Sequence, residues 1–261
     1  MSYLTYPAQF NGISLLTISG LTVLTTNPYE IPNRTLSIAN LTNTNTSTVS
    51  SAFYTSRTIT IRVGISRSSR ELVEQSLDNL MTVLQGKEKE LILNQAMTQR
   101  KYYCTLSDVV TSLSGGSYLE LDLVFTCSDS FGYDTTSTPL VTVTGHTTSY
   151  KSNSIVVDGS APWQQPVITL TYTVGPGAGS ASVIIDNPDN GQTITITRTA
   201  WTTADVLEID SYNKTVKVNG VEVEYSGAIP EWSPGNGYLV YSDNLASRTV
   251  NISVSYVKRW V

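Results

Sequence analysis

One histidine, two cysteines and four tryptophans are the residues of this chain whose chemistry could define a site. His146 is the only histidine, so a Ser-His-Asp triad would have to be built around it. Its neighbours Gly145 and Thr147 belong to a Ser/Thr-rich stretch, and the chain has no Gly-x-Ser-x-Gly nucleophile elbow. No pair of carboxylates stands out for glycoside hydrolysis. We therefore expect no enzymatic activity, no cofactor and no metal site.

Cys104 and Cys127 are the only cysteines, and both are expected to face a core. In the alternation of a strand, Cys104 has the same parity as Leu106, and Cys127 has the same parity as Phe125. We interpret the two residues as reduced, buried thiols, as is usual for a cytoplasmic product. A disulfide between them is the alternative.

Two loop motifs share features with ligand sites, but both are explained better as turns. The run from Gly175 to Gly179 is rich in glycine, yet it lacks the Lys-Ser/Thr of a phosphate-binding loop, so we predict a hairpin turn. The run from Asp186 to Gly191 offers carboxylate and amide oxygens, but their spacing does not match an EF-hand. We predict a turn without a metal ion.

The tryptophans raise the question of carbohydrate recognition. All four lie in the last hundred or so residues, and Trp201 and Trp232 lie near predicted loops, where an indole ring can stack on a sugar. These two are the candidate glycan-stacking residues. Packing in a core or between domains is the competing explanation.

Composition and charge limit the classes of partner. Only 14% of the residues are charged and the formal net charge is −5, which argues against the capture of nucleic acid through its phosphates. Residues 1–20 lack a basic region followed by a long apolar stretch, so we expect no secretory signal. No segment approaches the roughly 20 apolar residues that span a bilayer. We expect synthesis in the cytoplasm and no membrane insertion.

The clearest local pattern predicts a helix from Ser68 to Gly86. Ser68-Ser69-Arg70-Glu71 fits a capping box in which the Ser68 hydroxyl accepts from the Glu71 N–H. Gly86 is a natural stop. Between these ends, apolar residues recur at spacings of one, three and four: Leu72, Val73, Leu77, Leu80, Met81 and Leu84.

The rest of the chain alternates with a period of two, which predicts a mainly β protein with one helix that crosses between strands. A stretch rich in Ser, Gly, Pro and Asn at 145–166 divides it into predicted domains 1–150 and 151–261. Regularly spaced short strands in the second domain predict a β-sandwich. Asn219-Gly220 predicts a type I′ hairpin turn between two of these strands.

The segment from Ser37 to Ser56 carries no charge. Its Thr-Asn repeats are too polar to form a core and too β-prone for an ordinary linker, so we predict a long loop or a protruding hairpin.

The order of the predicted segments is more specific than any one of them. The segments are Arg57-Thr-Ile-Thr-Ile-Arg-Val-Gly-Ile65, the helix at 69–80, strands at 90–93 and 100–106, then 205–210, 215–220 and Trp232-Ser-Pro-Gly-Asn236. In this order they resemble the distal tail proteins of siphophages, which form the hub at the end of a long non-contractile tail.

That resemblance implies an N-terminal split β-barrel or sandwich domain with a single crossing helix, followed by a C-terminal galectin-like β-sandwich. It implies a structural virion protein at the distal end of the tail: a homo-oligomer, commonly a hexameric ring, through whose channel DNA passes. The implied partners are the tail tube protein, the tail-associated hub protein, and receptor-binding or side proteins. The uncharged 37–56 segment is then a candidate arm that pairs with a neighbouring subunit. A carbohydrate-binding module that engages host surface glycans is the alternative function.

Overall fold

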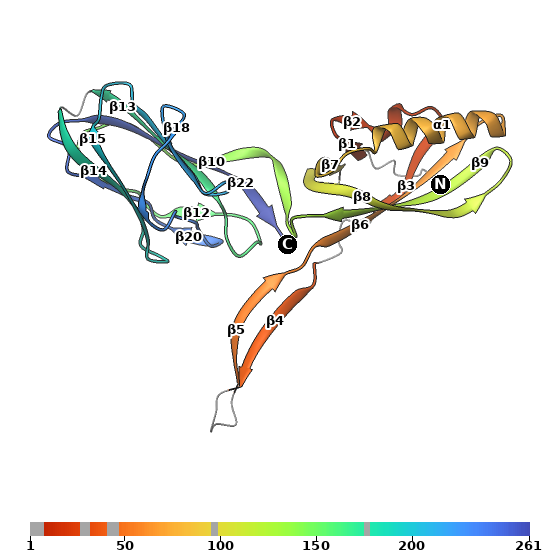
Figure 1. Cartoon of the computed structure of the whole chain (residues 1–261), viewed down its shortest axis with the longest axis horizontal. Coiled ribbons are helices and arrows are strands. Elements are labelled where there is room, and N and C mark those ends of the chain that lie inside the picture. The colour runs from red at the N-terminus through yellow and green to blue at the C-terminus, as the bar shows by residue number, and fades with distance from the viewer. Residues whose placement is uncertain (1–7, 27–31, 41–46, 95–98, 175–177) are drawn as a thin grey trace. The chain divides into compact units, whose positions relative to one another are not determined.

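The computed structural model describes residues 8–26, 32–40, 47–94, 99–174 and 178–261. The described part of the chain is mainly β with one α-helix, as predicted (Figure 1). The chain divides into two compact units, Met1–Thr135 together with Val261, and Thr136–Trp260. We call them unit 1 and unit 2. Within the described part of the chain, no helix has the length and apolar character that a membrane crossing requires.

The division between the units lies earlier in the chain than the predicted boundary at residue 150. It lies inside strand β10 (Gly132–His146). The residues up to Thr135 belong to unit 1, where Tyr133 and Asp134 pair with Lys101 and Arg100, and the residues from Thr136 on belong to unit 2. This part of β10 reads Asp-Thr-Thr-Ser-Thr, which resembles a linker in composition. Composition therefore placed the boundary in the loop after β10. The division itself lies within β10, which continues from one unit into the other.

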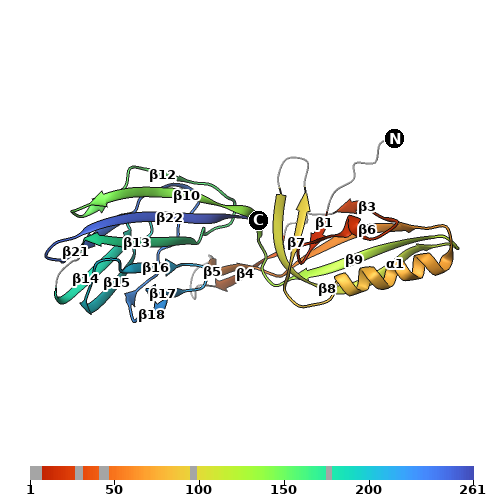
Figure 2. The same cartoon turned by 90° about the horizontal axis from the view of Figure 1, so that it is seen from above.

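Unit 1 is built on one antiparallel sheet in the order β3-β6-β9-β8-β7-β1-β2, which Figure 2 shows from above. Its strands are β1 (Ala8–Phe10), β2 (Ile13–Ser14), β3 (Leu21–Thr26), β6 (Arg57–Ser66), β7 (Lys89–Asn94), β8 (Gln99–Ser114) and β9 (Tyr118–Cys127). Among the described strands, β3 and β2 do not pair with each other, so the sheet is open and the expected split barrel is not closed.

A short helix follows β2 directly. Residues Leu15–Thr17 form one turn of 3-10 helix. The Ser14 hydroxyl accepts a hydrogen bond from the Leu16 N–H, which satisfies a backbone donor that a strand would have paired with a neighbour.

The predicted helix is confirmed as α1 (Arg70–Val83), with its start one residue later than predicted. Ser69 is the N-cap, and its hydroxyl accepts from the Leu72 N–H, so the predicted box from Ser68 to Glu71 is wrong. Val73, Leu80 and Leu84 are buried, and they belong to the same core as the inward-facing side chains of β6 and β9. The helix thus covers one face of the sheet.

The cysteines form a disulfide, which corrects the prediction of two reduced thiols. Cys104 on β8 and Cys127 on β9 are buried as predicted, but they are also directly opposite each other in the ladder. Directly opposed side chains on one face of a sheet lie close together. This pairing depends on the register of two strands, which neither strand reveals alone.

Unit 2 is a sandwich of two antiparallel sheets. One has the order β18-β17-β16-β13-β22-β10, and the other has the order β11-β21-β14-β15-β19. Its strands beyond β10 are β11 (Tyr150–Lys151), β12 (Ile155–Val157), β13 (Pro166–Val174), β14 (Ala178–Asn187), β15 (Gln192–Ala200), β16 (Val206–Asp210), β17 (Thr215–Val218), β18 (Val221–Glu222), β19 (Ser226–Gly227), β20 (Gly235–Gly237), β21 (Val240–Asp243) and β22 (Thr249–Trp260). The short pair β12 and β20 stands apart from both sheets.

Two turn predictions for unit 2 have opposite outcomes. Asn219 and Gly220 both have positive φ, 52° and 79°, between β17 and β18, as a type I′ turn requires. The predicted hairpin at Gly175–Gly179 is wrong, because the strands on either side, β13 and β14, belong to different sheets. Residues 175–177 themselves lie outside the described residues.

Candidate functional site

Most of the uncharged 37–56 segment belongs to a two-stranded sheet formed by β4 (Arg34–Asn40), which begins before it, and β5 (Ser47–Tyr54). The strands pair antiparallel from Arg34 opposite Tyr54 to Asn40 opposite Ser47. The prediction of a hairpin is confirmed for these strands, and residues 41–46 between them lie outside the described residues. We call Arg34–Tyr54 the arm; Figure 1 shows its two strands side by side.

The base of the arm is fixed to unit 1 by several contacts. The backbone N–H and the hydroxyl of Thr55 both donate to the carbonyl oxygen of Asn33, at 2.9 and 3.2 Å. The Ser130 hydroxyl donates to the Thr55 carbonyl at 2.5 Å, and the ring of Tyr54 meets Phe131 edge-on, with centroids 5.5 Å apart. These contacts join the two ends of the arm to each other and to residues 130 and 131, which follow β9.

The arm exposes apolar side chains on both of its faces. Leu36 is 47% exposed and Phe53 is 55% exposed. Leu36 lies opposite Ala52 and Phe53 opposite Thr35, so by strand alternation the two large side chains point to opposite faces. A two-stranded hairpin is marginally stable alone, and its free edges can accept another strand. The arrangement suits association with another chain.

The two candidate glycan-stacking residues are buried, which corrects that interpretation. Trp201 and Trp232 are each 1% exposed, and their indole N–H groups donate to the carbonyl oxygens of Ala181 and Tyr238. A ring that is 1% exposed offers no face to a sugar. The competing explanation, packing in a core, describes both residues.

The other residues considered for chemistry have structural roles. His146, at the end of β10, makes an edge contact with Tyr150. The predicted turn at Asp186–Gly191 joins the paired strands β14 and β15. Asn187 accepts a hydrogen bond from the Asp189 N–H within this turn, and Asp189 accepts one from the Tyr238 N–H outside it. Within the described ranges, His, Cys, Asp and Glu side chains nowhere gather in threes that could hold a metal ion.

Three buried ionisable groups of unit 2 have shifted pKa values. Burial raises the pKa of Tyr172 and of Tyr241 far above the ordinary value, so both phenols stay neutral. Burial alone would raise the pKa of Asp205, but hydrogen bonds from Thr202 and Asn219 and the charge of Arg198 outweigh it and lower that pKa. Asp205 thereby ties together the ends of two loops.

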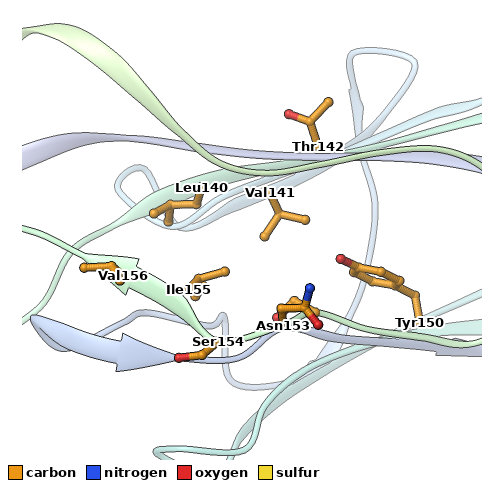
Figure 3. A pocket seen from close by; sticks show the side chains of 9 residues that line it. Leu140, Val141, Thr142, Tyr150, Asn153, Ser154, Ile155 and Val156 are labelled. Carbon is orange, nitrogen blue, oxygen red and sulfur yellow. The ribbon is translucent and has the colours of Figure 1, made fainter.

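Unit 2 also contains a cavity of about 340 Å³ that the sequence did not predict. It is lined by residues 140–142 of β10 and by residues 150 and 152–156, which include β12 (Figure 3). This second segment lies in the stretch that composition marked as a domain boundary. No signal in one segment alone indicates a cavity that two strands form together.

Comparisons with known proteins find a similar structure but no similar sequence. No family model matches the chain, and no curated protein matches it. The crystal structure of the SPP1 Dit protein, described as a paradigm of the hub adsorption apparatus in phages that infect Gram-positive bacteria, matches with a TM-score of 0.74. The match covers 98% of this chain and 99% of that chain at 11% identity. The two chains share one fold.

A further match is the structure of the phage P2 baseplate in its activated conformation with Ca, with a TM-score of 0.48, 10% identity and coverage of 97% of both chains. The match to the SPP1 Dit protein confirms the expected fold class, mainly β with a single helix followed by a β-sandwich. At 11% identity, the likeness lies in the order and pairing of the elements and in few of the residues.

Proposed function

We propose that this protein is a structural subunit of the distal tail hub, or baseplate, of a siphophage, and that it is not an enzyme. The observation that carries the proposal is the match of the whole chain, both units included, to a protein described as a hub of an adsorption apparatus. A shared sandwich alone would be weak support, because common folds serve many functions. Here the helix-bearing unit and the sandwich match together and in the same order.

The proposed assembly is a homo-oligomeric ring, with six subunits as the expected number. A closed ring needs two different complementary surfaces on each subunit, because its contacts run head to tail. The arm supports this proposal, since β4 and β5 pair with no other described strand and both faces of the arm expose an apolar side chain. In the proposed ring, the arm of one subunit binds the next.

At the proposed location in the virion tail, the protein would contact three kinds of protein partner: the tail tube protein, the tail-associated hub protein, and receptor-binding or side proteins. DNA would pass through the channel without being bound. The net charge of −5 supports transit without retention. On the sheet face opposite α1, Arg62 is paired with Asp122 at 2.7 Å, which reduces its attraction for phosphate.

The mass of the purified protein in solution tests the proposal. Light scattering after size exclusion should give several times the 28.4 kDa of one chain, and negative-stain electron microscopy should show rings. A protein that stays monomeric at micromolar concentration and shows no rings contradicts the proposed assembly.

A paired substitution tests the arm. Leu36→Ser with Phe53→Ser should shift the assembly toward monomers, because both side chains are exposed in the single chain. Val221→Ser is the matched control, since Val221 is 68% exposed in unit 2 and lies outside the arm. Intact rings in the double variant would show that the arm does not hold the ring together.

A further inference from the structure

The cavity of unit 2 is open to solvent and its lining is mostly polar, with a small apolar floor between two strands. Val141 on β10 and Ile155 on β12 are 6% and 8% exposed and belong to the core of the sandwich. Figure 3 shows both side chains directed into the space between the strands. A volume of about 340 Å³ lies at the lower end of the range for small-molecule sites.

One wall of the cavity is an aromatic ring held in a fixed orientation. The ring of Tyr150 points into the cavity in Figure 3. His146 meets it edge-on, with centroids 4.9 Å apart and an interplanar angle of 88°, and the backbone of Tyr150 pairs with Tyr241. Nearby, Ser152 exchanges two hydrogen bonds of 2.9 Å with Leu239. The wall is therefore in place before any ligand arrives.

The polar groups of the cavity are neutral and available. Asn153 and Ser154 are exposed, and none of the lining side chains carries a formal charge. Among the described residues, no side chain or backbone group forms a hydrogen bond with the Asn153 amide. An amide of this kind can both donate to and accept from a hydroxyl group.

We propose that this cavity binds a neutral carbohydrate. The C–H face of a sugar would lie against the Tyr150 ring and the apolar floor, while its hydroxyl groups would bond to the Asn153 amide and the neighbouring hydroxyls. The absence of lysine and arginine from the lining disfavours anionic ligands such as phosphate. This goes beyond the proposed hub function, and it places recognition at residues other than the buried Trp201 and Trp232.

A competing occupant is an extended peptide. Beyond Asp134, the described strands pair with β10 on one side only, through β22, so its other edge could accept a strand. The cavity favours a sugar, because a peptide strand would use only backbone groups and would leave Tyr150 and Asn153 without a role.

Saturation-transfer NMR of the full chain with a panel of neutral saccharides (maltose, cellobiose, lactose and chitobiose) tests the proposal. We expect at least one to bind, with affinity reduced about tenfold or more by Tyr150→Ala and about three- to tenfold by Asn153→Ala. Tyr225→Ala should leave binding unchanged, because Tyr225 is 40% exposed and does not line the cavity.

Two results would overturn the proposal: no saccharide of the panel binding at roughly ten millimolar, or binding that both cavity variants retain in full. Competition by an uncharged extended hexapeptide that also survives Tyr150→Ala would identify the peptide as the occupant instead. Circular dichroism of each variant shows whether it is folded. The cavity lies within one unit, so these outcomes are independent of whether the protein forms rings.

Discussion

The two units bury their cores by different means. Unit 2 closes two sheets over large aromatic side chains, and Trp201, Trp232, Tyr172 and Tyr241 are among its fully buried residues. Unit 1 covers one face of a single sheet with α1 and adds a disulfide between neighbouring strands. Its opposite face carries Thr58, Arg62 and Thr126, which are exposed.

Because of this difference, we expect substitutions in unit 2 and on the surface of unit 1 to affect different properties: the stability of the fold and the association of subunits. A sandwich satisfies both of its apolar faces internally, so its interior substitutions should affect folding. Unit 1 leaves a sheet face and an arm in contact with solvent, so substitutions there should affect assembly. A core variant of unit 2 with unchanged stability, or an arm variant that unfolds the chain, would contradict this difference between the units.

The largest expected effect is in the core of unit 2. Trp201→Ala should lower the free energy of unfolding by about 3 to 5 kcal/mol, because it leaves a cavity beside Tyr172 and removes the hydrogen bond to Ala181. Chemical denaturation followed by circular dichroism measures this. Trp163→Ala is the control, since Trp163 is 42% exposed and should cost less than about 1 kcal/mol. Equal effects of the two substitutions would contradict the different burial of the two rings.

The next effect is in unit 1 and depends on the disulfide. Replacing both Cys104 and Cys127 by Ala should lower the free energy of unfolding by about 2 to 4 kcal/mol, because the cross-link restricts the unfolded chain. Reductant should shift the denaturation midpoint of the wild type and leave that of the variant unchanged. Alkylation of both thiols in unfolded, unreduced protein would show that the disulfide is absent.

A smaller effect in unit 2 depends on pH. The pKa of Asp205 is lowered in the folded state, so the carboxylate contributes stability above its unfolded pKa of about 4, and this is lost as the pH falls through the lower folded value. Asp205→Asn should cost about 1 to 3 kcal/mol at neutral pH, because hydrogen bonds from Thr202 and Asn219 are altered.

The stability of the Asp205→Asn variant should also decline less than that of the wild type between about pH 5 and pH 2. Asp78→Asn on the exposed side of α1 is the matched control and should keep the decline of the wild type. Parallel stability curves for Asp205→Asn and the wild type would contradict the role of Asp205.

Features that depend on local backbone geometry could be predicted from the sequence. The turn at Asn219-Gly220 follows from two residues that tolerate positive φ, and α1 follows from a repeating apolar stripe. Features that depend on which segments meet could not. The burial of Trp201 depends on contact with β14, the disulfide depends on the register of β8 and β9, and the cavity depends on two strands facing each other.

The smallest expected effect is at the start of α1, where two adjacent serines compete for one role. The local pattern favours Ser68, because Glu71 is in position to complete a capping box with it. In the structure Ser69 has extended backbone angles, φ −147° and ψ 162°, and its hydroxyl lies 3.4 Å from the Leu72 nitrogen.

Ser69→Ala should therefore cost about 1 kcal/mol, and Ser68→Ala should cost less than about 0.5 kcal/mol, as measured by thermal unfolding. Since the two substitutions are chemically identical and one residue apart, their difference reports only which serine caps the helix. The expected order would show that Ser69 caps α1, although the local pattern favours Ser68. The reverse order would show that the capping box of Ser68 and Glu71 forms and that Ser69 does not cap the helix.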